Sequence, residues 1–131
     1  MSELKVGMKG SAEVEVCYAN TAAAVGSGAL EVFATPSMIA LMEKAALELA
    51  GSCLEEGQGT VGIEMNVQHL SATPVGETVR AEVELIAIEK RILTFKVQAF
   101  AGNELIGNGT HKRCIILNER FMEKTLAKYN K

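Results

Sequence analysis

A helical period of apolar side chains runs over residues 36–50 and predicts one long helix. Four residues at spacings of three and four form its apolar stripe: Met38, Met42, Ala45 and Leu49. Thr35 can cap the helix N-terminus, and Pro36 suits the first turn because an N–H group there would have no intrahelical partner. Gly51 can end the helix. Because one side of this helix is apolar, another element of the fold must cover it.

Polar and apolar residues alternate in five further segments, which is the period of a half-buried β-strand. These segments are residues 12–18, 60–70, 78–88, 92–101 and 105–117. The connections at 89–91 and 102–104 are short enough to form antiparallel hairpins. We therefore expect a sheet in which the last three strands are antiparallel neighbours.

Two segments lie outside the alternating pattern. Residues 20–28 are rich in alanine, glycine and serine and predict a flexible connection. Residues 118–129 predict a short C-terminal helix, which Asn118 caps and which directs three apolar side chains inward: Phe121, Met122 and Leu126. This order of elements predicts an α+β fold, with an antiparallel five-stranded sheet wrapped around the long central helix. The length fits a single domain over residues 1–131.

Composition and charge narrow the class of protein. Apolar residues make up 48% of the chain and charged residues 22%, which is typical of a globular rather than a disordered protein. The net charge of −3 gives no electrostatic reason to expect a nucleic-acid partner. No apolar run reaches the roughly 18 to 20 residues of a membrane span, and the N-terminus lacks the apolar core of a signal peptide. Cys17, Cys53 and Cys114 have neither metal-ligand nor disulfide spacing, so we expect reduced thiols in the cytoplasm.

Glu43 is a carboxylate on the flank of the apolar stripe. Its helical neighbours at spacings of three and four are all apolar: Ile39, Ala40, Ala46 and Leu47. An ionised carboxylate in such surroundings costs free energy unless it is paired or hydrogen-bonded, and groups of this kind are frequent in active sites. Two interpretations are open: a boundary residue whose carboxylate reaches water, or a functional carboxylate with a partner.

Two further side chains carry candidate chemistry. Strict alternation places His69 on the core face of its strand, together with Val61, Ile63, Met65 and Val67. A histidine there can be a core residue, or it can reach a cleft at the strand end and transfer protons near neutral pH. The Thr35 hydroxyl can be a cap alone, or it can stand beside a bound carbonyl with the first N–H groups of the helix.

The remaining candidates are weaker. His111 is a second histidine, but alternation does not fix which face of its strand it occupies. Two histidines without a carboxylate cluster make a weak metal site, and Cys53 has no obvious histidine partner. We therefore expect neither a bound metal nor a cysteine nucleophile.

Three segments resemble motifs of the fluoroacetyl-CoA thioesterase-like family, a group of hot-dog-fold proteins. Residues 32–46 resemble the central helix of that family, residues 67–79 its histidine strand and the following turn, and residues 106–113 a late strand. The motifs have matching order and spacing. The resemblance implies a hot-dog fold and hydrolysis of a small acyl-CoA to a carboxylic acid and free CoA. It implies no cofactor beyond the CoA that is part of the substrate.

The resemblance also implies which residues act. It assigns the catalytic groups to Thr35, Glu43 and His69, with Glu43 as the nucleophile or as a base on water. It places Gly62 and Arg113 in the substrate-binding region. It implies a homodimer or a higher homo-oligomer, with sites near the subunit interface. Two alternatives stay open: a non-catalytic module that binds acyl-CoA, and a hot-dog enoyl-CoA hydratase or dehydratase.

One departure from the family concerns the segment before residue 32. The fluoroacetyl-specific enzyme carries a longer, aromatic-rich segment there, which covers its pocket. Residues 21–30 of this chain are instead short and small-sided. We therefore expect thioester hydrolysis to carry over, and the selectivity for fluoroacetyl-CoA not to.

Overall fold

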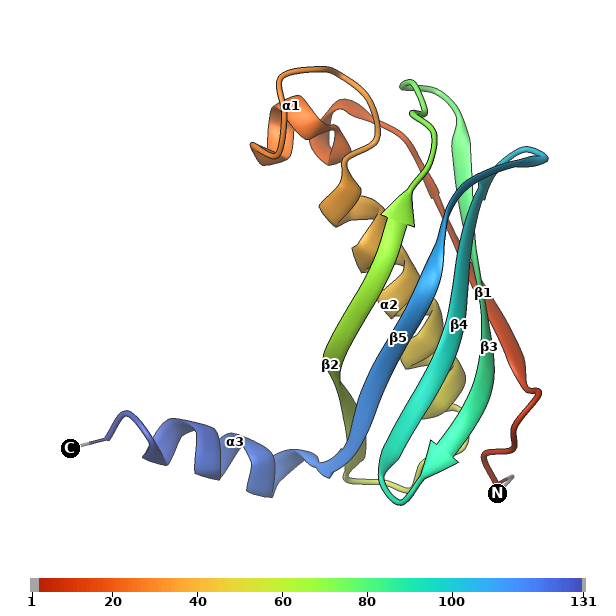
Figure 1. Ribbon diagram of the computed structural model, residues 1–131. Helices are drawn as coiled ribbons and strands as arrows, with labels where there is room; N and C mark the ends of the chain where they lie inside the picture. The colour runs from red at the N-terminus through yellow and green to blue at the C-terminus, as the bar shows by residue number, and fades with distance from the viewer. Residues whose placement is uncertain (1–2, 131) are drawn as a thin grey trace.

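An antiparallel sheet curls around the long helix α2 in the computed structural model, which describes residues 3–130 (Figure 1). Its elements, in chain order, are β1 (Lys9–Glu15), the 3-10 helix η1 (Tyr18–Asn20), α1 (Ala22–Val25), α2 (Thr35–Gly51), β2 (Gln58–His69), β3 (Thr78–Glu89), β4 (Ile92–Ala101), β5 (Glu104–Leu117) and α3 (Asn118–Ala127). The strands lie in the order β1-β3-β4-β5-β2, and neighbouring strands are antiparallel. The predicted α+β architecture and both predicted hairpins are confirmed.

The core lies between α2 and the side of the sheet that faces it. Its helical side consists of Met38, Leu41, Met42, Ala45, Ala46 and Ala50. Its sheet side consists mainly of alternate residues of β3 and β4: Val79, Ala81, Val83, Leu85, Leu93, Phe95, Val97 and Ala99. Burial of this apolar surface fixes α2 along its length. A side chain on the flank of α2 therefore has a defined place relative to the sheet.

The chain before α2 differs from its predicted structure. The first strand, predicted over residues 12–18, begins and ends earlier because its pairing with β3 stops at Glu15. Residues 20–28, predicted as a flexible connection, contain the short helix α1. The Thr21 hydroxyl caps this helix by accepting a hydrogen bond from the Ala24 N–H at 3.4 Å. A local cap thus gives regular structure to a segment whose composition indicated flexibility.

A β-bulge in β2 changes which of its residues face α2. The register with β5 shifts at Ile63, which is 51% exposed. The prediction that Val61 and Ile63 share a face with His69 is therefore wrong. Before the bulge, Thr60 and Gly62 take the face toward α2 instead. Because a bulge inserts one residue, every side chain before it moves to the opposite face.

Helix α3 follows β5 and extends past the edge strand β2, away from the body of the fold (Figure 1). The predicted inward orientation of its apolar side chains is wrong, because Phe121, Met122 and Leu126 are 37%, 51% and 60% exposed. Its N-cap is Leu117 without a side-chain hydrogen bond, so Asn118 is its first residue rather than its cap. Within residues 3–130, no helix has both the length and the apolarity to cross a membrane.

Candidate active site

Thr35 is the first residue of α2 and not its cap. The N-cap is Ala34, whose backbone is extended and whose side chain forms no cap hydrogen bond. The Thr35 hydroxyl instead lies 2.7 Å from Nδ1 of His69, the last residue of β2. The predicted cap is therefore wrong by one residue. The hydroxyl joins the start of the helix to the end of β2.

The His69 ring is half-buried beside this hydroxyl. Burial lowers the pKa of His69, and a backbone interaction with Ser71 offsets part of that effect. Its Nε2 atom is buried and has no hydrogen-bond partner among the described residues. Burial thus favours the neutral ring, in which Nδ1 contacts the Thr35 hydroxyl and the buried Nε2 has no hydrogen-bond partner among the described residues.

A hollow of about 320 Å³ opens beside this pair. It is lined by Ala22, Ser27, Val32, Phe33, Thr35, His69, Leu70, Ser71 and Ala72. At the start of α2, the N–H groups of Thr35 and Ser37 have no intrahelical partner and carry the positive end of the helix dipole. The hollow therefore adjoins the N-terminus of α2, with Thr35 and His69 in its wall.

Glu43 lies two turns further along α2, and its partner comes from β5. Its Oε2 atom is 3.8 Å from Nη1 of Arg113, and the Glu43 side chain is 42% exposed. Burial lowers the pKa of Arg113, and the charge of Glu43 opposes that effect. The pair thus joins a carboxylate that water reaches to a guanidinium that is buried.

Hydrogen-bond acceptors on β2 and β5 hold the Arg113 guanidinium. Its Nε donates to Thr60 Oγ1 at 2.8 Å and its Nη2 to the Thr60 carbonyl at 3.1 Å. Its Nη1 lies 3.1 Å from Nε2 of His111. Thr60 was not predicted from the sequence, because the bulge reverses the alternation before it. His111 had no assigned face, yet its spacing of two from Arg113 was a signal that both lie on one side of β5.

Gly62 leaves room for the Glu43 carboxylate. A Cβ atom at Gly62 would lie 2.6 Å from Glu43 Oε2, 3.2 Å from His111 Cε1 and 3.5 Å from Arg113 Nη1. The first of these distances is too short for any stable contact, so a side chain here would displace the carboxylate. The glycine therefore belongs to the same site as Glu43 and Arg113.

The predicted site residues fall into two groups within one chain. Thr35 contacts His69, and Glu43 contacts Arg113 beside Gly62. Glu43 is eight positions after Thr35 on the helix, which corresponds to a rise of roughly 12 Å. Among the described residues, no hydrogen bond or ion pair joins the two groups, and no three His, Cys, Asp or Glu side chains gather to hold a metal ion.

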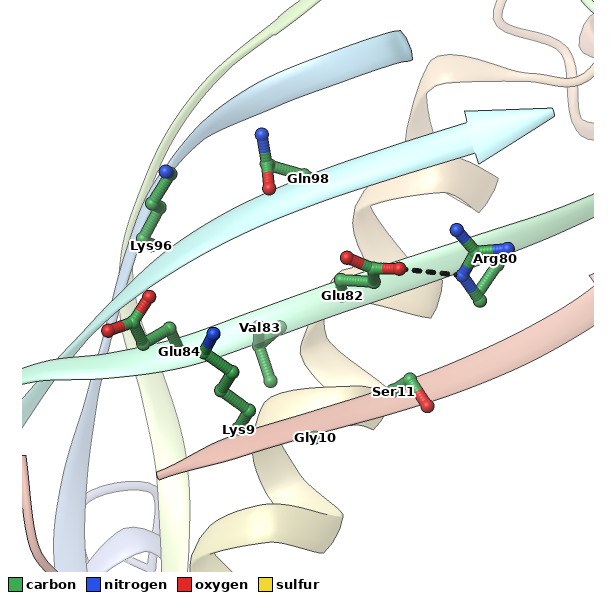
Figure 2. Close-up of a pocket in the computed structure, with 9 residues that line it drawn as sticks. All are labelled: Lys9, Gly10, Ser11, Arg80, Glu82, Val83, Glu84, Lys96 and Gln98. Atoms are coloured by element: carbon green, nitrogen blue, oxygen red, sulfur yellow. Dashed lines mark hydrogen bonds and ion pairs between the residues drawn. The ribbon is translucent and has the colours of Figure 1, made fainter. Parts of the chain in front are cut away.

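A larger hollow of about 420 Å³ lies on the side of the sheet away from α2 (Figure 2). Its walls are formed by Lys9, Gly10, Ser11, Arg80, Glu82, Val83, Glu84, Lys96 and Gln98. It contains an exposed ion pair, with Arg80 Nε 2.7 Å from Glu82 Oε2, and pairs of this kind contribute little to stability. None of the predicted site residues lines this hollow, so we interpret it as a solvated, charged surface of the sheet.

Comparison with known proteins places this chain in a family. The family model described as Fluoroacetyl-CoA-specific thioesterase matches residues 16–119. The fluoroacetyl-CoA thioesterase of Streptantibioticus cattleyicolor is 43% identical over 98 residues, which cover 75% of this chain and 70% of that protein. The match spans Thr35, Glu43, Gly62, His69 and Arg113.

Solved structures agree with this match. The structure of the fluoroacetyl-CoA thioesterase FlK is 34% identical with a TM-score of 0.91, covering 97% of this chain and 98% of that chain. A hot-dog-like protein from Thermanaerovibrio acidaminovorans is 20% identical with a TM-score of 0.88, covering 96% of this chain and 93% of that one, and shares the fold. The chain therefore belongs to the fluoroacetyl-CoA-specific thioesterase family and is a thioester hydrolase of the hot-dog fold.

Proposed function

We propose that this protein hydrolyses a small acyl-CoA to a carboxylic acid and free CoA, with Glu43 as the nucleophile or the base. The environment of Glu43 carries this proposal: a carboxylate that water reaches, beside the buried Arg113, with space left by Gly62. Such a carboxylate can attack the thioester carbonyl or take a proton from water. In the first route the carboxylate displaces CoA, whose sulfur takes a proton, and water then cleaves the acyl–Glu43 anhydride to the carboxylic acid and the free carboxylate. In the second route water gives a proton to Glu43 and adds to the acyl carbon, and the carbon–sulfur bond breaks as that proton passes to the CoA sulfur.

The Thr35–His69 pair is proposed to bind the thioester carbonyl. We place its oxygen near the N-terminus of α2, where Thr35 and the first N–H groups stabilise the charge that develops on it. His69 orients the Thr35 hydroxyl through the 2.7 Å contact. Its second ring nitrogen has no partner among the described side chains and can carry a proton between water and the leaving sulfur.

A homodimer that pairs two β2 strands is proposed to complete the site. β2 lies at the edge of the sheet, where a second strand can pair with it. Antiparallel pairing across a two-fold axis sets the His69 end of one β2 beside the Gln58 end of the other. Gly62, which faces Glu43, lies nearer the Gln58 end. The Thr35–His69 pair of one subunit then approaches Glu43 of the partner subunit, so each site uses both.

Mixing two inactive variants tests the shared site. Glu43→Gln and His69→Ala dimers should each be inactive. After subunit exchange we expect about a quarter of the wild-type activity, because half of the dimers are mixed and each mixed dimer keeps one intact site of two. CoA release before and after exchange measures this, with native mass spectrometry to verify that mixed dimers form. Mixed dimers without any recovered activity contradict a site shared between subunits.

The acyl group is proposed to be short, without selectivity for fluoroacetyl-CoA. Residues 21–30 form α1 and a small-sided connection beside the hollow, in place of an aromatic cover. The hollow of about 320 Å³ adjoins both Thr35 and His69. A site open on this side offers few contacts that distinguish fluorine from hydrogen on the acyl group.

Release of free thiol separates this function from its alternatives. Hydrolysis liberates CoA. An enoyl-CoA hydratase changes the enoyl group but retains the thioester, and a binding module leaves both the acyl group and the thioester unchanged. A panel of acyl-CoAs graded by chain length, with aromatic and halogenated members, should give the fastest release from short chains. We expect the preference for fluoroacetyl-CoA over acetyl-CoA to stay below about tenfold, since small differences in an open pocket are weakly discriminated. A much larger preference contradicts the proposed substrate range.

We also propose a cytoplasmic location. The three cysteines, Cys17, Cys53 and Cys114, are all free thiols, which supports a reducing compartment. Fractionation of source cells, with thioesterase activity followed in each fraction, checks this.

A further inference from the structure

His111 is a buried histidine that the proposed hydrolysis does not yet use. Its Nδ1 atom lies 2.9 Å from the carbonyl oxygen of Glu64 on β2. A carbonyl only accepts hydrogen bonds, so this nitrogen must carry the proton. Its Nε2 atom lies 3.1 Å from Arg113 Nη1, and a guanidinium only donates. The two contacts together require a neutral ring, protonated on Nδ1 and accepting a hydrogen bond on Nε2.

The same guanidinium nitrogen faces both His111 and Glu43. Arg113 Nη1 is 3.1 Å from His111 Nε2 and 3.8 Å from Glu43 Oε2. The longer contact, to a carboxylate that is 42% exposed, is too weak to fix a buried guanidinium by itself. The shorter hydrogen bonds that Arg113 donates to His111 and Thr60 fix the guanidinium. The position of Arg113 is thus set by the sheet, and Glu43 meets a cation that is already in place.

The surroundings of His111 favour its neutral form. Burial lowers the pKa of His111, the bond to the Glu64 carbonyl opposes this, and the charges of Arg113 and Glu43 act in opposite directions. From β4, the Phe95 ring stacks on the imidazole with centroids 6.2 Å apart. A protonated ring would place a second positive charge beside Arg113 and would have no acceptor at Nε2. The neutral ring is therefore the form that can accept the hydrogen bond from the guanidinium.

We propose that His111 is a positioning residue for hydrolysis, whose neutral ring holds the Arg113 guanidinium where it pairs with Glu43. This inference rests on the proposed catalytic role of Glu43. It assigns His111 an effect on turnover without contact with the substrate, and it assigns Thr60 the same effect from the other side of the guanidinium.

Two substitutions of His111 separate its two hydrogen bonds. In His111→Asn, the amide nitrogen replaces Nδ1 and keeps the Glu64 bond, but Arg113 loses its acceptor. In His111→Gln, the amide oxygen reaches the position of Nε2 and restores that acceptor. We expect a kcat roughly ten- to a hundredfold lower in His111→Asn, as for a lost hydrogen bond to a charged group, and recovery of most of this loss in His111→Gln. KM should change little in either variant.

Further variants test the same positioning role independently of any folding defect in the His111 variants. Thr60→Val is close in shape and removes only the hydroxyl that accepts from Arg113 Nε, so kcat should fall here as well. In an Arg113→Ala background, His111→Asn should lower kcat no further, because the group that it positions is gone. Circular dichroism and the melting temperature show whether each variant is folded.

Each outcome bears on one claim. If Glu43→Gln is inactive but folded His111→Asn and Thr60→Val keep the wild-type kcat, the positioning role is wrong and the proposed function stands. An increase in KM alone also overturns it, because Arg113 would then act by holding substrate. If Glu43→Gln hydrolyses normally, the proposed role of Glu43 fails, whatever the His111 variants show.

Discussion

Replacing Glu43 by glutamine is expected to remove nearly all thioester hydrolysis while leaving the fold intact. The amide keeps the size of the side chain but can neither attack a thioester carbonyl nor accept a proton from water. Loss of a general base or nucleophile lowers turnover by roughly a hundred- to ten-thousandfold. The side chain is 42% exposed and its ion pair with Arg113 is long, so little stability should be lost. CoA release under substrate saturation measures the effect.

The same helix offers a matched control for this variant. Glu48 also lies on α2 but is exposed, so Glu48→Gln makes the same chemical change away from the site. We expect wild-type turnover and a similar melting temperature in that control. Full activity of folded Glu43→Gln would show that hydrolysis does not require the carboxylate. The Thr35–His69 pair would then have to carry out the reaction.

The long helix and the hairpins could be predicted because local pattern and tertiary environment agree. The apolar stripe that predicts α2 is the side that the sheet buries. The strand predicted over residues 92–101 is β4 at Ile92–Ala101, since a central strand alternates cleanly between the core and the outer face. The resemblance to a family then supplied the hot-dog fold, which the comparisons confirm.

The bulge in β2 was missed, and it determines which side chains face Glu43. Ile63 continues an apolar alternation, which conceals the register shift, but an isolated glycine within a strand pattern, here Gly62, is a signal for a bulge. Counted without the bulge, Thr60 and Gly62 face away from His69. Gly62 was found only through the family resemblance, and Thr60 was missed. Similarly, the pattern of α3 indicated an apolar face, but a pattern does not show whether the same chain covers it.

The proposed catalytic residues illustrate a second limit of the sequence. Thr35 and His69 were proposed to act with Glu43, yet within one chain the Thr35–His69 pair lies at the start of α2 and Glu43 lies two turns further along it. Spacing along a sequence fixes positions on a helix or strand, but it does not show which subunit completes a site. The roles of all three remain predictions, which the subunit-mixing experiment and the Glu43 variant test.

Replacing Gly62 by alanine is expected to lower hydrolysis about a hundredfold or more, because a displacement near 1 Å of a reacting group has effects of this size. The new Cβ would lie 2.6 Å from Glu43 Oε2 and 3.2 Å from His111 Cε1. The imidazole is held by the Glu64 carbonyl and by Phe95, whereas the carboxylate ends a half-exposed side chain. The carboxylate therefore moves away, and the pair with Arg113 lengthens.

The stability of Gly62→Ala should stay within about 1 kcal/mol of the wild type, since a flexible side chain absorbs the contact. An unchanged free energy of unfolding would show that the lost activity is not caused by a folding defect. Urea denaturation measures this free energy, and CoA release measures the activity. Gly51→Ala is the matched control. Gly51 lies at the end of α2, the helix that carries Glu43, and a Cβ atom there would have no neighbour within 4 Å. Wild-type turnover in stable Gly62→Ala would mean that Glu43 reacts from another position, and both the Arg113 pair and the His111 support would then be irrelevant to catalysis.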